Sequence, residues 1–330
     1  MKQVLLFFFS ALALAPVFGQ DLHFSQAPLA PFQQNPALTG VFNGDYRAGA
    51  NYRKQWKSIP VPYETESFFA DGKLLDLGSL VVAAGVKFDH DEAGDAAISW
   101  SNGTIFGSIS RILNQSSAVS LGVALGGGQR KFHINKLRWG KQYISDSYVP
   151  TANSFESFGR STGFVPDFGA GVNWHWQQNN RRSFFNLGLG SFHLNRPTVS
   201  FRDEKASRLA TRFNLNCDAA TQIGALRDFL ISTNVQKQGP YNEAIVSVGM
   251  RRWLKPEQTA ASFLLGVRLG DAIIPQVRLE WGNWLLGLSY DWNFSGINDA
   301  TFGKGGPEVG IQWRFVKVPP VKVFKVCPIY

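Results

Sequence analysis

Hydrophobic and polar residues alternate with a period of two through much of the chain. In residues 305–316 the apolar residues Val309, Ile311, Trp313 and Phe315 occupy every second position, with polar or small residues between them. The same alternation is found in three further segments, 117–130, 272–281 and 284–294. Side chains on a β-strand point alternately to its two faces, so this pattern predicts strands with one apolar and one polar face.

Residues typical of turns divide the chain from Asp45 onward into about fourteen strand-like segments, and twelve or sixteen strands are also compatible with the pattern. Most segments have about ten residues, the length of a tilted strand that crosses a bilayer. The alternation shifts at Asn102-Gly103, and Pro275 cannot donate a ladder hydrogen bond, so we expect a bulge or an edge at Pro275. We predict strands at 45–55, 62–71, 78–88, 96–112, 117–130, 164–176, 182–193, 210–219, 228–237, 241–252, 260–269, 272–281, 284–294 and 307–317.

The lengths of the connections also follow a pattern. The long connections, 131–163, 194–209 and 295–306, all follow odd-numbered predicted strands, and connections after even-numbered strands are short. Outer-membrane barrels have short periplasmic turns and long outer loops, whereas a soluble β-sandwich has no reason to sort its loops in this way. The sequence therefore predicts an all-β, antiparallel, transmembrane barrel of the bacterial outer membrane, closed by pairing of residues 305–316 with 45–55.

Aromatic residues gather near the predicted strand ends, which is typical of the interfacial girdles of membrane barrels. The core of a soluble β-fold is the alternative explanation. From Glu308 to Phe315 the pattern polar–x–Gly–x–x–aromatic–x–aromatic is similar to the terminal-strand signal of bacterial outer-membrane barrels. The aromatic pairs are Tyr52 and Trp56, Trp174 and Trp176, Trp281 and Trp284, Trp292 and Phe294, and Trp313 and Phe315.

The chain begins with features of a secretory signal peptide. Lys2 precedes an apolar run over residues 4–14, which is too short for a comfortable transmembrane helix, and we predict a signal peptide at 1–19 with cleavage before Gln20. Residues 20–43 lack strand periodicity but carry apolar side chains that favour burial. We interpret them as an ordered periplasmic or plug-like segment, with disorder as the alternative. The barrel is predicted at 44–317 and a periplasmic tail at 318–330.

Composition and charge narrow the class further. Charged residues are 17% of the chain, below the roughly 25% of soluble proteins, and aromatic residues are 14%. Two cysteines, Cys217 and Cys327, do not make a disulfide scaffold. The formal net charge is +9, but the basic residues are scattered, which favours anionic lipid or an acidic partner over nucleic acid.

Charged residues on the polar faces of the predicted strands are the candidates for a functional site. Pointing into a lumen, they could tune a pore or hold a polar ligand, or they could form an ion-pair network that fills the barrel. A filled barrel would be a docking platform and an open one a channel. The candidates for a lumen or partner site are Arg268, Arg278, Glu280, Asp291, Glu308 and Arg314, and Lys87, Glu243 and Arg251 lie on the same faces.

Catalytic and metal-binding motifs do not stand out. The five histidines show no metal-ligand spacing and no nucleophile motif is present, so we expect no catalytic residue, no metal and no cofactor. A hydrolase site that uses His133, His175 or His193 is a lesser alternative.

Several ordered motifs resemble the PorP/SprF family of type IX secretion outer-membrane proteins of Bacteroidetes. Together they span nearly the whole mature chain, although RLATRFNLN at 208–216 departs from the usual strand start of the family. The motifs are QDLHFSQ (20–26), QNPALTG (34–40), NGDYRAGANYRKQW (43–56), KLRWGKQY (136–143), SFHLNRPTVSF (191–201), YDWNFSG (290–296), GGPEVGIQW (305–313) and CPIY (327–330).

The resemblance implies a non-enzymatic outer-membrane component of the type IX secretion system. It would assist secretion or surface anchoring of cargo proteins that carry a C-terminal sorting domain, with type B suspected, and it would contact the periplasmic ring and motor of the system. A porin or transporter of small solutes is the alternative. The tail residues that we expect to dock on a partner or on the periplasmic turns of the barrel are Val323, Phe324, Cys327, Pro328 and Tyr330.

Overall fold

The computed structural model describes residues 21–55, 63–94, 96–133, 136–144, 147–155, 162–179, 181–201, 207–255, 258–295 and 304–317. Within these residues fourteen strands form a closed antiparallel barrel, as the alternation predicts. They are β1 (Tyr46–Gln55), β2 (Tyr63–Asp76), β3 (Leu80–Ala93), β4 (Ile98–Asn114), β5 (Ser117–Lys131), β8 (Thr162–Gln177), β9 (Phe184–Phe192), β10 (Arg212–Gly224), β11 (Arg227–Gln238), β12 (Tyr241–Lys255), β13 (Thr259–Arg268), β14 (Ala272–Trp281), β15 (Trp284–Asn293) and β16 (Lys304–Phe315).

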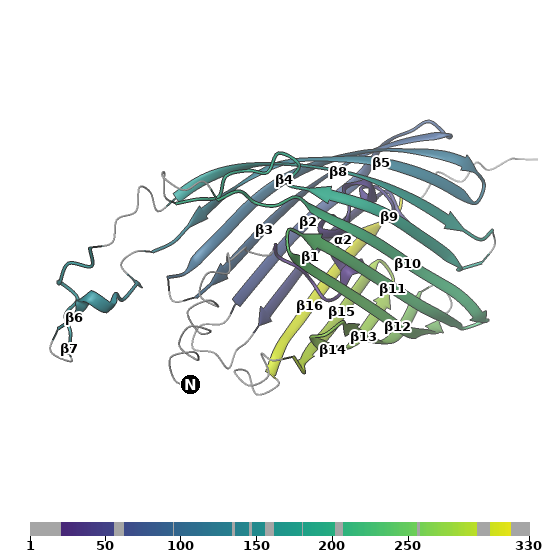
Figure 1. Ribbon diagram of the computed structural model, residues 1–330. Coiled ribbons are helices and arrows are strands. Elements are labelled where there is room, and N and C mark those ends of the chain that lie inside the picture. Colours follow the sequence, from purple (N-terminus) through teal and green to yellow (C-terminus); the bar gives the residue numbers. More distant parts are fainter. Residues whose placement is uncertain are drawn as a thin grey trace, which may run out of the picture.

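Each strand of the barrel pairs with its neighbour along the chain, and β1 pairs with β16 to close the ring (Figure 1). The register of the closing pair runs from Tyr46 opposite Phe315 to Arg53 opposite Glu308, which confirms the predicted closure. The connection between β5 and β8 contains η4 (Gly140–Gln142) and the small sheet of β6 (Tyr143–Ile144) and β7 (Ser147–Tyr148), which lies outside the barrel.

Two local expectations need correction. The strand β4 itself has no irregularity at Asn102-Gly103, because it pairs with β3 and β5 there without a change of register. The irregular sequence pattern arises because Trp100 and Phe106 are apolar residues on the lumen face. Pro275 interrupts the pairing of β14 with β15 but shifts no register, so neither a bulge nor an edge forms.

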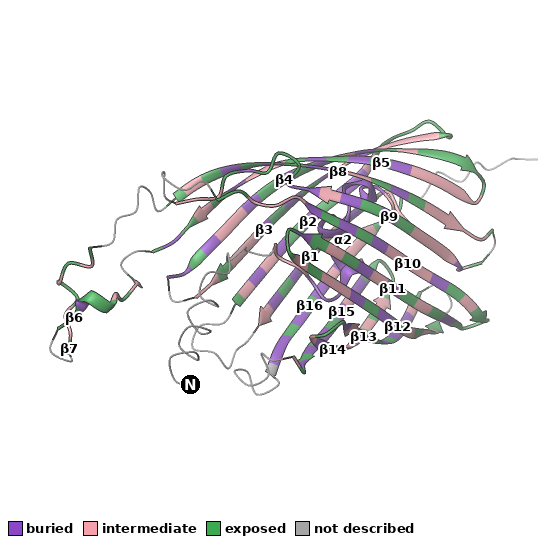
Figure 2. Ribbon diagram, in the orientation of Figure 1, coloured by how far each residue is buried: buried purple, intermediate pink, exposed green. Residues whose placement is uncertain are grey.

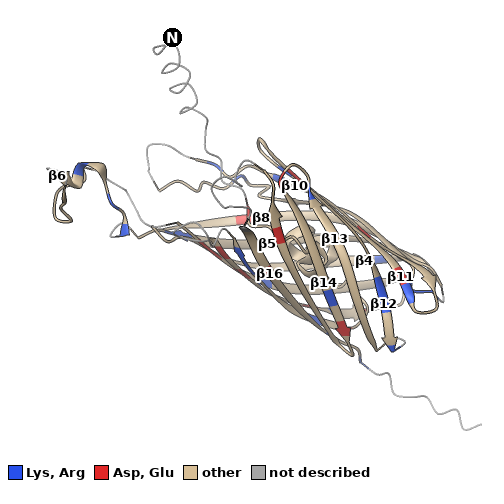
Figure 3. Ribbon diagram, turned by 90° about the horizontal axis from the view of Figure 1, so that it is seen from below, with Lys and Arg blue, Asp and Glu red and all other residues tan. Residues whose placement is uncertain are grey.

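The two faces of the wall have the polarity of a membrane barrel. Apolar side chains such as Leu121 and Phe263 are exposed on the outside, while Asn173 and Gln276 are buried inside, and burial alternates along the strands in Figure 2. Lys and Arg are scattered among uncharged residues (Figure 3). No helix among the described residues is long and apolar enough to cross a membrane.

The three longest connections, which follow β5, β9 and β15, lie at one end of the barrel, as predicted, and the connections at the other end have two to six residues. We call the end where β1 begins and β16 ends the short-turn end, and the other the long-loop end. At the short-turn end, Trp281, Trp284, Trp313 and Phe315 form a row of neighbouring rings with centroid separations of 6.5, 6.5 and 5.7 Å, in keeping with a girdle. Trp56, another expected girdle residue, lies outside the described residues.

Residues 21–43, which we call the plug, lie inside the barrel (Figure 1). The plug contains three short helices, η1 (Ala27–Leu29), α2 (Pro31–Gln34) and η2 (Pro36–Leu38). Its path runs from the long-loop end, where Asp21 contacts His193, to the short-turn end, where Asp45 precedes β1. The segment therefore occupies the lumen, which is the plug-like one of the two interpretations of residues 20–43.

Candidate functional site

The sequence of the plug explains its compact shape. Each of its three helices has a proline at the first or second position, where the missing N–H has no helical partner to lose. Phe32 is buried between the rings of Phe106, stacked at 4.2 Å, and Phe69, edge-on at 5.6 Å. The prolines fix the turns, and this aromatic contact fixes the plug against the wall.

Glycines on the lumen face let the plug approach the wall. A Cβ atom at Gly122 would lie 2.4 Å from the backbone nitrogen of Ala37, and one at Gly190 would lie 2.4 Å from the carbonyl oxygen of Gln34. The side chain of Asn35, fully buried between these strands, donates to the carbonyl of Val172 at 2.9 Å. The glycines thus leave the space that the plug backbone occupies.

An ion-pair cluster holds the start of the plug at the long-loop end. His193 Nε2 bonds Asp21 Oδ2 at 2.7 Å, His193 Nδ1 bonds Asp167 at 2.8 Å, and Arg212 contacts Asp21 at 3.2 Å. Burial lowers the pKa of His193, but the Asp21 and Asp167 carboxylates outweigh burial and raise it to about 9. Burial raises the pKa of Asp21, but the cations His193 and Arg212 outweigh it and leave that pKa well below its usual range. At neutral pH the imidazole is therefore protonated, and its ion pair with Asp21 holds the start of the plug.

A second cluster, which we call the anchor cluster, consists of Ser25, Arg53, Arg268, Asp291 and Glu308. Asp291 accepts from Ser25 Oγ at 2.8 Å and pairs with Arg53 at 2.6 Å and Arg268 at 2.9 Å. Glu308 accepts the backbone N–H groups of Ser25 at 2.6 Å and of the next residue at 2.8 Å. All five residues are buried, so inside the barrel the wall pairs the hydroxyl of Ser25 and the backbone N–H groups of Ser25 and Gln26.

The stability of the plugged barrel is expected to fall as the pH rises from 7 to 10. A pKa raised from 6.5 to about 9 means that the contribution of His193 is complete below pH 6.5 and is lost as the pH passes 9. The free energy of unfolding should fall by an amount on the order of 2–3 kcal/mol over this pH range. Thermal unfolding at each pH measures it as the difference between the wild type and His193→Gln. Parallel pH curves for the two proteins would contradict the assignment.

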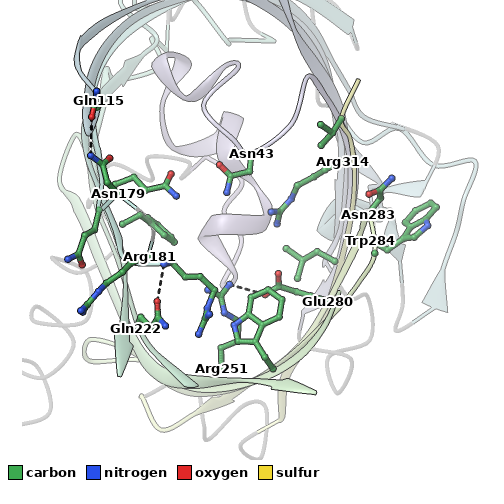
Figure 4. A pocket seen from close by; sticks show the side chains of 18 residues that line it. Asn43, Gln115, Asn179, Arg181, Gln222, Arg251, Glu280, Asn283, Trp284 and Arg314 are labelled. Carbon is green, nitrogen blue, oxygen red and sulfur yellow. Dashed lines mark hydrogen bonds and ion pairs between the residues drawn. The ribbon is translucent and has the colours of Figure 1, made fainter. Parts of the chain in front are cut away.

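A cavity of about 910 Å³ lies at the short-turn end, away from the anchor cluster and from the contacts of Asp21. Turn residues such as Gln115, Asn179 and Asn283 line it, as do Arg314 and Glu280 (Figure 4). Two smaller cavities, of about 370 and 160 Å³, also contact Arg314, so this side chain lies where the three spaces meet. We call the largest of them the short-turn cavity.

One wall of the short-turn cavity is a preassembled charge cluster. Asp228, which is fully buried, pairs with Arg182 at 3.0 Å and with Arg251 at 2.8 Å, and it accepts from Trp253 Nε1 at 2.8 Å. Arg251 also pairs with Glu280 at 3.2 Å (Figure 4). Among the described residues the guanidinium of Arg314 has no hydrogen bond or ion pair, and Figure 4 shows it directed into the cavity.

The six charged candidates from the sequence all face the interior, but they divide into two groups. The first, Arg268, Asp291 and Glu308, holds the plug. The second, Glu280 and Arg314, lines the short-turn cavity; Arg278 lines the 160 Å³ cavity beside it and donates to Gln276 at 3.0 Å. The tail candidates Val323, Phe324, Cys327, Pro328 and Tyr330 lie outside the described residues.

Sequence reasoning offered a plug-like segment and placed Arg268, Asp291 and Glu308 inside the barrel, but it did not name the plug residues that bond to the wall. Asp21, His23, Ser25 and Gln26 all belong to the motif QDLHFSQ, and each bonds or pairs with the barrel wall. The density of polar residues in that motif was an available signal. Arg182 and Trp253 gave no comparable signal, because their partner Asp228 lies on another strand.

The histidines do not form a catalytic centre in this arrangement. His175, near the short-turn end, contacts Asn186 at 2.7 Å, whereas His133 and His193 lie at the long-loop end. Within the described part of the chain, no group of three or more His, Cys, Asp or Glu residues is placed to hold a metal ion.

Comparisons with known proteins agree with the motifs and the fold. A family model described as "Type IX secretion system membrane protein PorP/SprF" matches residues 17–306, which confirms the resemblance. No curated protein matches the sequence.

Among solved structures, the chain is similar to the toluene transporter TbuX of Ralstonia pickettii, at 9% identity and a TM-score of 0.51, over 90% of this chain and 96% of that one. It is also similar to a deltaS2 mutant of the monoaromatic hydrocarbon channel TodX, at 9% identity and a TM-score of 0.50, over 86% of this chain and 93% of that one. At such low identity these similarities show the barrel fold alone.

Proposed function

Since this chain belongs to the PorP/SprF family of type IX secretion system membrane proteins, we propose that it is a non-enzymatic outer-membrane component of that system. It assists secretion or surface anchoring of specific cargo proteins that carry a C-terminal sorting domain of type B. It also contacts the periplasmic ring and motor components. The signal peptide is cleaved near Gln20 before the barrel is inserted.

The observation that carries this proposal is the asymmetric filling of the lumen. The ion pairs of Asp21 and of the anchor cluster hold the plug toward the long-loop end, whereas the short-turn half contains the 910 Å³ cavity beside the last residues of the plug. Outer-membrane barrels place their short turns in the periplasm. A barrel of this kind presents a closed lumen to the outside and a cup to the periplasm, which suits a docking platform better than a channel.

Deletion of the gene tests the function in the cell. Surface display of the specific cargo should be lost, because the platform that receives it is missing, while uptake of small solutes should remain normal. Surface proteomics measures the display of cargo, and growth on limiting small solutes measures solute uptake. Normal cargo display in the deletion strain would contradict the proposal, and ion conductance of the purified barrel in planar bilayers would favour the alternative of a small-solute porin.

A further inference from the structure

We propose that the short-turn cavity binds an extended acidic peptide segment of a periplasmic partner, and that Arg314 is the residue that pairs with its carboxylate. This inference rests on the proposed function in one respect, that the short-turn end faces the periplasm. The binding itself is a property of the purified barrel and can be measured whether or not the protein serves secretion.

The charge of the cavity selects an anionic ligand. Among the described residues four arginines line it, at positions 181, 182, 251 and 314, against one carboxylate, that of Glu280. Arg182 and Arg251 already share Asp228, and Arg251 also pairs with Glu280. Arg314 has no such partner among the described residues, so its partly buried guanidinium is free to bind a carboxylate.

The size and shape of the cavity select an extended ligand over a small anion. Its volume of about 910 Å³ is near the upper limit of small-molecule pockets, and the adjoining 370 Å³ cavity shares Gln177, Phe184 and Arg314 with it. A phosphate or a single amino acid would need several donors that converge on one point. Instead, Figure 4 shows Arg314 and Arg251 on separate parts of the wall, so one ligand that reaches both must be long.

The uncharged part of the lining suits a peptide backbone. Amide side chains are frequent in the lining and include Gln115, Gln178, Asn179, Gln222 and Asn283. Each amide offers both a donor and an acceptor, the combination that peptide C=O and N–H groups require.

The charged wall opposite Arg314 is rigid. Trp253 lies against the guanidinium groups of Arg182 at 5.5 Å and Arg251 at 4.9 Å, and its indole N–H is held by Asp228. A wall fixed in advance loses little conformational entropy when a ligand binds.

Peptide binding to the full-length barrel in nanodiscs tests the proposal. The probe is a fluorescein-labelled dodecapeptide of alternating Glu and Ser, compared by fluorescence anisotropy with the same peptide carrying Gln for every Glu. We expect the acidic peptide to bind and the Gln peptide to bind at least about tenfold more weakly. Arg314→Gln should weaken binding of the acidic peptide by about tenfold to a hundredfold, the loss of a hydrogen-bonded charge pair.

Two further variants separate recognition from an effect on folding. Glu280→Gln removes the carboxylate of the lining and frees the Nη1 group of Arg251, whose other nitrogens stay paired with Asp228. It should therefore tighten binding of the acidic peptide by a few-fold, an effect that damage to the fold would not produce. Arg252→Gln makes the same charge change as Arg314→Gln at an exposed position next to Arg251, on the other face of β12, and should leave binding unchanged.

The proposal is overturned if the wild type binds both peptides equally, or if Arg252→Gln weakens binding as much as Arg314→Gln. Displacement of the acidic peptide by an equal concentration of inorganic phosphate would also overturn it, because the cavity would then be a small-anion site. Failure of the deletion strain to lose cargo display would contradict the proposed function and would leave these binding results unchanged.

Discussion

Alanine at Gly122 is expected to displace the plug and open the lumen. Its Cβ atom would lie 2.4 Å from the backbone nitrogen of Ala37 and 2.4 Å from the carbonyl carbon of Pro36, closer than real Cβ atoms approach any heavy atom. Both neighbours are backbone atoms, so no change of rotamer can relieve the contact. Overpacking of this kind costs about 1–3 kcal/mol, which should raise the fraction of displaced plug by about tenfold to a hundredfold.

Planar-bilayer recordings measure this change directly. The wild type should be almost silent, and Gly122→Ala should show openings whose frequency rises by the same factor. Gly103→Ala is the matched control, because it adds the same methyl group to β4 at a position with no heavy atom within 4 Å. Equal open probability in the two variants would show that η2 does not depend on contact with β5.

The fold could be predicted because lipid constrains one face of every strand. Outward residues such as Leu121, Val123 and Leu125 must be apolar, so their alternation marks the strands in the sequence itself. The sorted loops and the closing pair follow from the same constraint. Where β2 and β10 continue past their predicted ends, the register shifts between Lys73 and Leu75 and between Gln222 and Gly224, and these irregularities break the alternation in the sequence.

The inner face could not be predicted in the same way, because the plug and not the lipid decides what packs there. Phe106 faces the lumen, where Phe32 stacks on it. This apolar residue on an otherwise polar face made the sequence pattern look as if the alternation shifted. The alternation along the strands placed Arg268 and Arg314 inside the barrel, but it did not show that the two side chains have different surroundings. One contacts the plug and the other the open cavity, and that difference depends on the path of a segment that has no periodicity.

Replacing Arg53 by alanine is expected to destabilise the barrel by about 3–5 kcal/mol. Its guanidinium pairs with Asp291 at 2.6 Å and lies 4.0 Å from Glu308, and all three side chains are at most 2% exposed. Removing Arg53 leaves Asp291 with Arg268 alone and leaves Glu308 without a cation among the described residues, and unpaired charge is costly in a medium of low dielectric constant. Urea unfolding of the barrel in lipid vesicles, followed by tryptophan fluorescence, measures the free energy.

The neighbouring residue supplies the control, because Lys54 pairs with Glu64 where the two side chains are 28% and 41% exposed. Water screens such a pair, so Lys54→Ala should leave the free energy of unfolding nearly unchanged. If the cost at Arg53 is that of an unpaired carboxylate, adding Glu308→Gln to Arg53→Ala should recover part of the loss, since a neutral amide needs no cation. Further destabilisation in the double variant would instead mean that Glu308 is stabilised by its two backbone N–H donors from the plug, with Arg53 contributing through packing alone.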